Sequence, residues 1–129
     1  MKKIITASLT ASLMCLFTAP VYADSVEHQW KCHRLDSATM DDVIAATSVW
    51  FKAAKTNEGG ENMKLSLKFP IAVDTIDGDF IQVVVFPDTK EWADFTHNYK
   101  DSPAGKAEDA WYEVATCLGS EIWQSVDFE

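Results

Sequence analysis

Residues 80–86 read FIQVVVF and are apolar at every position except Gln82. A strand that is apolar on both faces is typical of the centre of a sheet that is covered on both sides. Residues 63–69, MKLSLKF, instead alternate between apolar and polar side chains, and the lysines on one face predict an exposed edge strand. Asp77 and Gly78 lie between the two runs and favour a hairpin that pairs them.

The segment before this hairpin predicts a strand followed by a helix. Residues 26–35, VEHQWKCHRL, alternate along their length, which is the pattern of a strand. Residues 40–55 place apolar side chains about every 3.6 positions, which is the period of a helix buried on one face. Thr39 is the expected N-cap of this helix, and Asp42 completes a variant of the capping box.

The segment after the hairpin predicts two helical pieces and a last strand. Asp88 caps a helix whose apolar stripe carries Trp, Phe and Tyr side chains. Ser102 as N-cap and Pro103 at the first helical position start a second piece, which we expect to continue to Cys117. Residues 121–128, EIWQSVDF, read as the fourth strand.

With the two helical pieces counted as one helical segment, the order of these elements is β-α-β-β-α-β, which predicts an α+β protein with the ferredoxin-like, split βαβ arrangement. In this topology the first and third strands form the middle of a four-stranded antiparallel sheet, and the fourth strand lies beside the first. Helices cover only one face of such a sheet, so the apolar second face of residues 80–86 needs another cover. We expect a homodimer in which the two sheets pack against each other.

The N-terminal segment is predicted to be a signal peptide. Lys2 and Lys3 precede an apolar run over residues 4–19, and residues 21–23, Val-Tyr-Ala, resemble a small-x-small cleavage site. The run is diluted by Ser and Thr and is too weakly apolar for a membrane-spanning helix. We therefore expect a periplasmic or secreted product in which residues 24–129 form a single domain.

The composition excludes several classes of protein and partner. The chain has 129 residues, with 11 Lys and Arg against 20 Asp and Glu, and a net charge of −9. Loss of both N-terminal lysines with the signal peptide would lower the net charge from −9 to −11. We expect no nucleic acid or membrane as partner, because phosphate binding needs clustered Lys and Arg. The five tryptophans exclude a disordered acidic tail.

Signal cleavage would leave two cysteines, Cys32 and Cys117. In an oxidising compartment this pair favours a disulfide, whose loop of about 85 residues is worth roughly 4 kcal/mol in the chain-entropy model. The alternatives are a reactive thiol or a soft-metal site, since His28 and His33 lie close to Cys32 in the sequence. We favour the disulfide, because the sequence has no second cluster with ligand spacing.

Residues 86–88 read Phe-Pro-Asp, and residues 99–103 read Tyr-Lys-Asp-Ser-Pro ahead of the second helical piece. Together with the order of elements, this stretch resembles the dimeric α/β-barrel superfamily, which includes antibiotic-biosynthesis monooxygenase-like, NIPSNAP-like and stress-responsive barrel proteins. The resemblance implies the fold and the dimer, and members include oxygenases, haem-degrading enzymes and isomerases. Residues 104–109 lack the His that haem-degrading members carry in this region, which disfavours haem degradation.

Aromatic residues and a few polar ones are the candidates for a site. The five tryptophans either build the core and a dimer interface or line a pocket for a flat apolar ligand. For such a pocket, the candidate ligand-binding residues are Trp30, Trp92 and Tyr99. For catalysis, the candidates are His33, Tyr99 and Arg34, as base, donor and anion partner.

These features lead to one hypothesis and two alternatives. We expect an exported, dimeric α/β-barrel protein that binds a small apolar or aromatic ligand and holds no metal or other cofactor. The first alternative is a cofactor-free monooxygenase or isomerase. The second is a non-catalytic accessory subunit whose sheet docks another chain. No Ser-His-Asp order, phosphate-binding glycine loop or His-Glu-x-x-His pattern in the sequence points to a different class of enzyme.

Overall fold

A computed structural model describes residues 24–71 and 77–126 of the chain. The predicted signal peptide, residues 1–23, lies outside the described residues. Four strands and three helices follow one another along the chain: β1 (Ser25–Arg34), α1 (Met40–Ala54), β2 (Lys64–Lys68), β3 (Asp79–Phe86), α2 (Thr89–His97), α3 (Pro103–Trp111) and β4 (Ala115–Ser125). None of these helices is long and apolar enough to cross a membrane.

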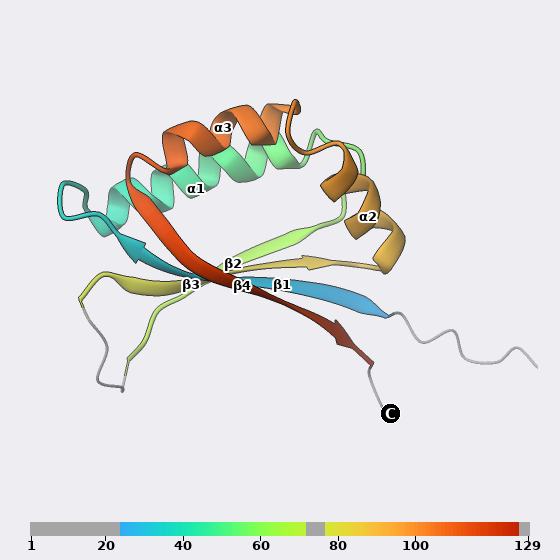
Figure 1. Cartoon of the computed structure of the whole chain (residues 1–129), viewed down its shortest axis with the longest axis horizontal. Coiled ribbons are helices and arrows are strands. Elements are labelled where there is room, and N and C mark those ends of the chain that lie inside the picture. The colour runs from blue at the N-terminus through green and yellow to red at the C-terminus, as the bar shows by residue number, and fades with distance from the viewer. Residues whose placement is uncertain (1–23, 72–76, 127–129) are drawn as a thin grey trace, which may run out of the picture.

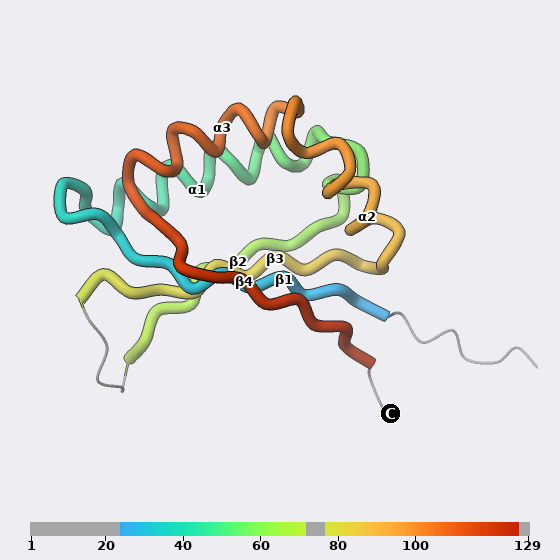
Figure 2. Tube along the Cα trace, viewed as in Figure 1, coloured from blue at the N-terminus to red at the C-terminus, as the bar shows by residue number. Residues whose placement is uncertain are grey.

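The strands form one antiparallel sheet in the order β2-β3-β1-β4, and all three helices lie over the same face of it (Figure 1). β1 and β3 are the central strands, and β4 lies beside β1. The predicted α+β, ferredoxin-like arrangement is therefore confirmed. The trace in Figure 2 shows α3 running beside α1, while α2 stands at the end of the helix layer.

Alternation along β1 and β3 decides which side chains meet the helices. On β3 the residues Phe80, Val84 and Phe86 lie in the core, and Gln82 shares their face. The helix-facing row of β1 is paired with them in register: Val26 with Phe86, His28 with Val84, Trp30 with Gln82, and Cys32 with Phe80. The other face of β3 carries Ile81, Val83 and Val85, and no helix among the described residues covers it.

Each helix begins at the residue that the sequence predicts. Thr39 accepts a hydrogen bond from the backbone of Asp42, whose side chain bonds back to Thr39, so the capping box is complete. Asp88 and Ser102 likewise cap α2 and α3 by accepting a bond from the backbone amide three residues on. These caps fix where the chain turns from sheet to helix and back.

The predicted boundary between the last helix and the last strand is wrong. α3 ends at Trp111 instead of continuing to Cys117, and β4 begins at Ala115, before the predicted residues 121–128. Pairing with β1 explains the difference, because Ala115 lies opposite Arg34 and the backbone there is extended by the ladder. An Ala-rich segment that suits a helix is thus held as a strand by tertiary contacts.

A disulfide joins Cys32 of β1 to Cys117 of β4, which confirms the predicted pairing. The two residues lie directly opposite each other in the ladder. The bond therefore closes β4 onto β1 at the point where the ladder shifts register, between Lys31 and Cys32.

Candidate ligand-binding cavity

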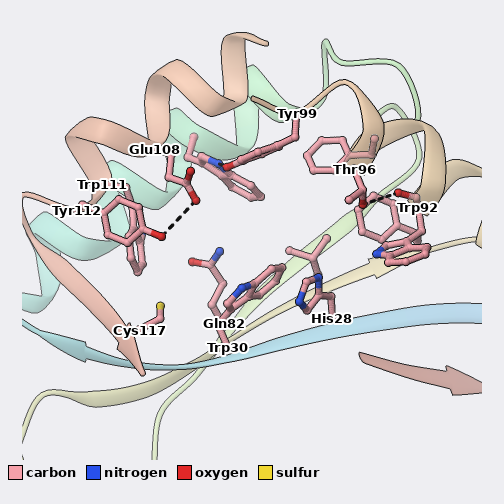
Figure 3. Close-up of a pocket in the computed structure, with 14 residues that line it drawn as sticks. His28, Trp30, Gln82, Trp92, Thr96, Tyr99, Glu108, Trp111, Tyr112 and Cys117 are labelled. Atoms are coloured by element: carbon pink, nitrogen blue, oxygen red, sulfur yellow. Dashed lines mark hydrogen bonds between the residues drawn. The ribbon is translucent and has the colours of Figure 1, made fainter. Parts of the chain in front are cut away.

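A cavity of about 280 Å³ lies between the helix layer and the sheet (Figure 3). Its floor comes from β1 and β3, and its roof and ends come from the three helices and the residues that follow them. Most of the wall is aromatic: Trp30, Trp50, Phe86, Trp92, Phe95, Tyr99, Trp111 and Tyr112. A concave, mainly aromatic site with a few polar groups is the usual form of a small-molecule site.

Simple periodicities place these side chains. His28 and Trp30 are two residues apart on β1, so both point toward the helices, and their rings stack with centroids 3.7 Å apart. Glu108, Trp111 and Tyr112 follow the helical spacing of three and four residues, so the end of α3 presents all three to the cavity. One strand row and one helix face thus account for much of the lining.

Hydrogen bonds hold part of this wall in position. The indole N–H of Trp50 donates to the hydroxyl of Tyr99 at 2.8 Å, and that of Trp111 donates to the hydroxyl of Thr47 at 2.9 Å. Both bonds satisfy the polar end of a large buried aromatic ring. They link α1 to α3 and to the segment after α2, so the roof of the cavity is fixed before any ligand binds.

A carboxylate and two phenols form the polar part of the roof. The Tyr112 hydroxyl donates to Glu108 Oε1 at 3.4 Å. Burial raises the pKa of Tyr99 well above its ordinary range, and burial followed by the charge of Glu108 raises the pKa of Tyr112. Both phenols therefore stay protonated near neutral pH and act as hydrogen-bond donors or as neutral aromatic surface.

Three buried polar atoms in the cavity lining have no hydrogen-bond partner among the described residues. They are Nε2 of His28, Oε1 of Gln82 and Nε1 of Trp92. A buried polar atom without a hydrogen-bond partner lowers the stability of the folded state by about 1 to 3 kcal/mol. Such atoms are therefore rare in folded proteins. All three belong to residues that line one cavity.

His28 is the one basic side chain in the described lining. Burial lowers its pKa below the ordinary value of 6.5, so the imidazole is neutral at neutral pH. In a neutral imidazole one ring nitrogen donates and the other accepts a hydrogen bond. His28 can therefore orient a polar group of a ligand, or take a proton from it.

All three predicted ligand-binding residues, Trp30, Trp92 and Tyr99, line this cavity. They come from β1, from α2 and from the segment between α2 and α3. Their role in binding a ligand stays a prediction, but the structure brings them together around one space.

The structure does not bring His33 and Arg34 to Tyr99. His33 points to the open face of the sheet, where its Nδ1 lies 2.7 Å from a carboxylate oxygen of Asp79. The Arg34 guanidinium donates to backbone carbonyls of the turn between β1 and α1. Only Tyr99 of the predicted catalytic candidates contributes to the cavity.

The structure does not bring His28, Cys32 and His33 together as ligands of a soft metal. The sulfur of Cys32 is bonded to Cys117, and the two imidazoles lie on opposite faces of β1. No group of three metal-ligating side chains is found among residues 24–71 and 77–126.

Sequence reasoning missed Gln82 and Glu108 as site residues and considered His28 only as a metal ligand. Gln82 had a signal, since it is the one polar residue in an apolar strand. His28 had one too, because it shares a face with Trp30 in the alternation of β1. Glu108 stands one helical turn before Trp111, a spacing that becomes informative only once the end of α3 is known.

No protein-family model matches the chain, and no curated protein matches it in sequence. Solved structures do match it. SnoaB, a cofactor-independent oxygenase from Streptomyces nogalater, has a TM-score of 0.58 at 10% identity, covering 80% of this chain and 94% of SnoaB. A putative antibiotic biosynthesis monooxygenase from Caulobacter crescentus has a TM-score of 0.51 at 13% identity, covering 84% of this chain and 94% of its own.

A dimeric ferredoxin-like protein of unknown function from Thermobifida fusca is also similar, with a TM-score of 0.52 at 12% identity, covering 81% of this chain and 92% of its own. At these identities the likeness concerns the fold. It confirms the resemblance to antibiotic-biosynthesis monooxygenase-like and dimeric ferredoxin-like proteins at that level, and the activity has to be argued from the site.

Proposed function

We propose that this protein binds a small, mostly aromatic molecule in the cavity between its sheet and helices. The observation that carries the proposal is the set of three unpaired polar atoms, on His28, Gln82 and Trp92, in a mostly aromatic wall. Small-molecule sites commonly enclose about 300 to 1,000 Å³. A cavity of about 280 Å³ lies just below this range and suits a molecule of one or two rings.

A thermal-shift screen with one-ring and two-ring aromatic compounds tests this proposal. Val84 lines the cavity from β3, so Val84→Phe would fill part of it. Ligands should raise the melting temperature of the wild-type protein and have a smaller effect on Val84→Phe. Val49→Phe, at an exposed position of α1, is the matched control and should respond like wild type. If no compound in the screen stabilises the folded wild type, the proposal is wrong.

A cofactor-free enzyme is the second candidate. SnoaB, whose fold is similar, is described as a cofactor-independent oxygenase. The neutral His28 in the cavity supplies a base, and abstraction of a ligand proton by such a base needs no cofactor. For each compound that binds, NMR in D₂O measures how fast its carbon-bound protons are replaced by deuterium. This exchange should be fast with wild type and slow with His28→Gln. Exchange at the uncatalysed rate with both proteins would favour a binding protein without catalysis.

We further propose that a second copy of the chain covers the open face of the sheet. Ile81 and Val85 of β3 lie partly exposed there, and Trp123 of β4 is 55% exposed. The similar protein from Thermobifida fusca is described as dimeric. Recovery of the chain with a different protein in place of its own copy would instead support an accessory subunit.

Export is the proposed location. The sequence of residues 1–23 supports it, as does the Cys32–Cys117 disulfide, since such bonds persist mainly in oxidising compartments. Mass spectrometry of the protein recovered outside the cytoplasm should give a chain that begins at Asp24. Recovery of the uncleaved chain in the cytoplasm would contradict the proposal.

A further inference from the structure

We propose that the ligand of this cavity is an organic cation, whose positive charge lies among the aromatic rings beside Glu108. This inference rests on the proposed function, because it names the chemical class of the molecule that the cavity binds. It draws on four features of the lining: the aromatic faces, the carboxylate, an unpaired acceptor opposite the carboxylate, and the lack of a competing cation.

The aromatic wall is the first feature. Four of the five tryptophans of the chain line the cavity, Trp30, Trp50, Trp92 and Trp111, together with Tyr99 and Tyr112. The face of an aromatic ring carries partial negative charge and attracts an ammonium or alkylammonium group, most strongly in tryptophan. A neutral aromatic ligand would also suit these walls, so the charged groups have to decide between the two.

The carboxylate of Glu108 is the second feature. It descends from α3 into the cavity, between Tyr112 and Tyr99, as Figure 3 shows. Its hydrogen-bond partner is the neutral hydroxyl of Tyr112, and it forms no ion pair with a described residue. A half-buried carboxylate without a cation gains most from a cationic ligand, because partial burial strengthens the attraction.

The side chain of Gln82 is the third feature. It rises from β3 toward the roof that carries Glu108, and its Oε1 has no partner although the residue is only 9% exposed. An amide oxygen and a carboxylate on opposite sides of one space form a pair of acceptors. The carboxylate attracts a positively charged group and repels an anionic one, and the unpaired amide oxygen is an acceptor across the space from it.

The fourth feature is the charge around the ligand. No lysine or arginine appears in the described lining, and the pKa of His28 is lowered by burial, so no positive side chain competes for Glu108 near neutral pH. The net charge of −9 also concentrates cations near the surface of the protein. At the other end of the cavity, the indole N–H of Trp92 still needs an acceptor, so a ligand with an oxygen opposite its cationic group fits best.

A matched pair of probes tests the inference. Trimethylphenylammonium and tert-butylbenzene have almost the same shape and differ in charge. Each is titrated into the purified full chain, with binding followed by tryptophan fluorescence and by calorimetry. Wild type should bind the cation about tenfold more tightly, which is the size of one good cation–π and carboxylate contact. Glu108→Gln should reduce this preference to less than about threefold.

Glu113→Gln is the control, because it makes the same change at an exposed position after α3, outside the cavity lining, and should keep the tenfold preference. Far-ultraviolet circular dichroism and melting temperature establish that each variant is folded. Equal affinity for the two probes in wild type, or an unchanged preference in Glu108→Gln, overturns the inference and leaves the binding function intact. Binding of neither probe, nor of any compound in the thermal-shift screen, overturns both.

Discussion

The surroundings of Gln82 are unfavourable for a polar side chain. It lies on a central strand, buried, with an unpaired amide oxygen, where an apolar side chain would satisfy every contact of the folded state. A residue of this kind lowers stability unless something binds it, and such residues are common in functional sites. The presence of a single polar residue, Gln82, in the strand FIQVVVF is thus best explained by the cavity that its side chain faces.

Replacement of this residue should separate stability from binding. Gln82→Met removes an unpaired acceptor and keeps the size of the side chain, so the free energy of unfolding should rise by about 1 kcal/mol. Affinity for aromatic ligands should fall at the same time. Urea unfolding and fluorescence titration measure the two effects. Gln29→Met is the control, because that amide bonds Glu27 on the open face, and it should bring no gain in stability.

The buried imidazole of His28 predicts a dependence of stability on pH. The pKa of His28 is lower in the folded state than the ordinary value of 6.5. As the pH falls below 6.5, His28 is therefore protonated in the unfolded chain before it is protonated in the folded one. Stability should therefore fall as the pH drops from about 7.5 to about 5, and less so in His28→Asn. His97→Asn, at an exposed position of α2, should keep the wild-type profile. Parallel profiles in all three proteins would contradict this explanation.

At the scale of single residues, the sequence predicted the aromatic part of the site better than its polar part. Trp30, Trp92 and Tyr99 were predictable because most large aromatic rings of a small domain are packed between its elements, although Trp123 is 55% exposed. His33 and Arg34 were plausible in sequence but lie away from the cavity, since strand alternation and a turn direct them elsewhere. Whether a lone polar side chain reaches a cavity depends on neighbours that the sequence does not place.

At the scale of elements, a close contact between two segments positions the roof of the cavity. A Cβ added to Gly105 in the first turn of α3 would lie 2.5 Å from the carbonyl oxygen of Tyr99 and 2.7 Å from that of Lys100. These distances are shorter than any real contact, and both neighbours are backbone atoms that cannot move alone. α3 therefore lies directly against the segment that carries Tyr99 because this residue has no side chain.

Gly105→Ala should destabilise the protein by about 1 to 3 kcal/mol, despite the better helix propensity of alanine. Ligand affinity should also fall, since the clash displaces Tyr99 from the cavity wall. Denaturant unfolding and the same titrations measure both. Gly119→Ala on β4 is the control, because a Cβ there meets nothing within 4 Å. A stable, fully binding Gly105→Ala would show that the roof does not depend on this contact.

The boundary between α3 and β4 shows the limit of reasoning from local pattern. Residues 102–117 carry a cap, alanines and apolar spacing that suit one long helix. The chain instead leaves the helix after Trp111 and pairs with β1 from Ala115 onward. The caps of all three helices were predictable because they depend on neighbouring residues, whereas this end depends on a strand about 80 residues earlier in the chain.

At the scale of the whole molecule, the fold was predictable because the order of elements allows few arrangements. The ferredoxin-like sheet places the apolar strand of a β-α-β-β-α-β chain at its centre and the lysine-bearing strand at its edge. The disulfide independently places β4 beside β1. The cavity was less predictable. It exists because aromatic side chains from separate elements leave a space between them, which is a property of packing and not of any segment.

The open face of the sheet predicts a dimer. Light scattering should give twice the mass of one chain, and Ile81→Lys should reduce this to a single chain, because a charge replaces an apolar contact at the interface. Ile44→Lys is the control at an exposed position of α1, 47% exposed in the structure, and should stay dimeric. A wild-type protein with the mass of one chain would contradict the predicted assembly.

The account depends on one claim, that the space between sheet and helices is where a small molecule binds. The indole N–H signals of the five tryptophans test it most directly, in a two-dimensional ¹H–¹⁵N NMR spectrum recorded during titration with a compound that stabilises the protein in the thermal-shift screen. Trp30, Trp50, Trp92 and Trp111 line the cavity, whereas Trp123 lies on the open face of β4. The signals of the first four should move together to saturation while that of Trp123, assigned with Trp123→Phe, stays in place. Movement of Trp123 alone, or of no signal, would contradict the claim.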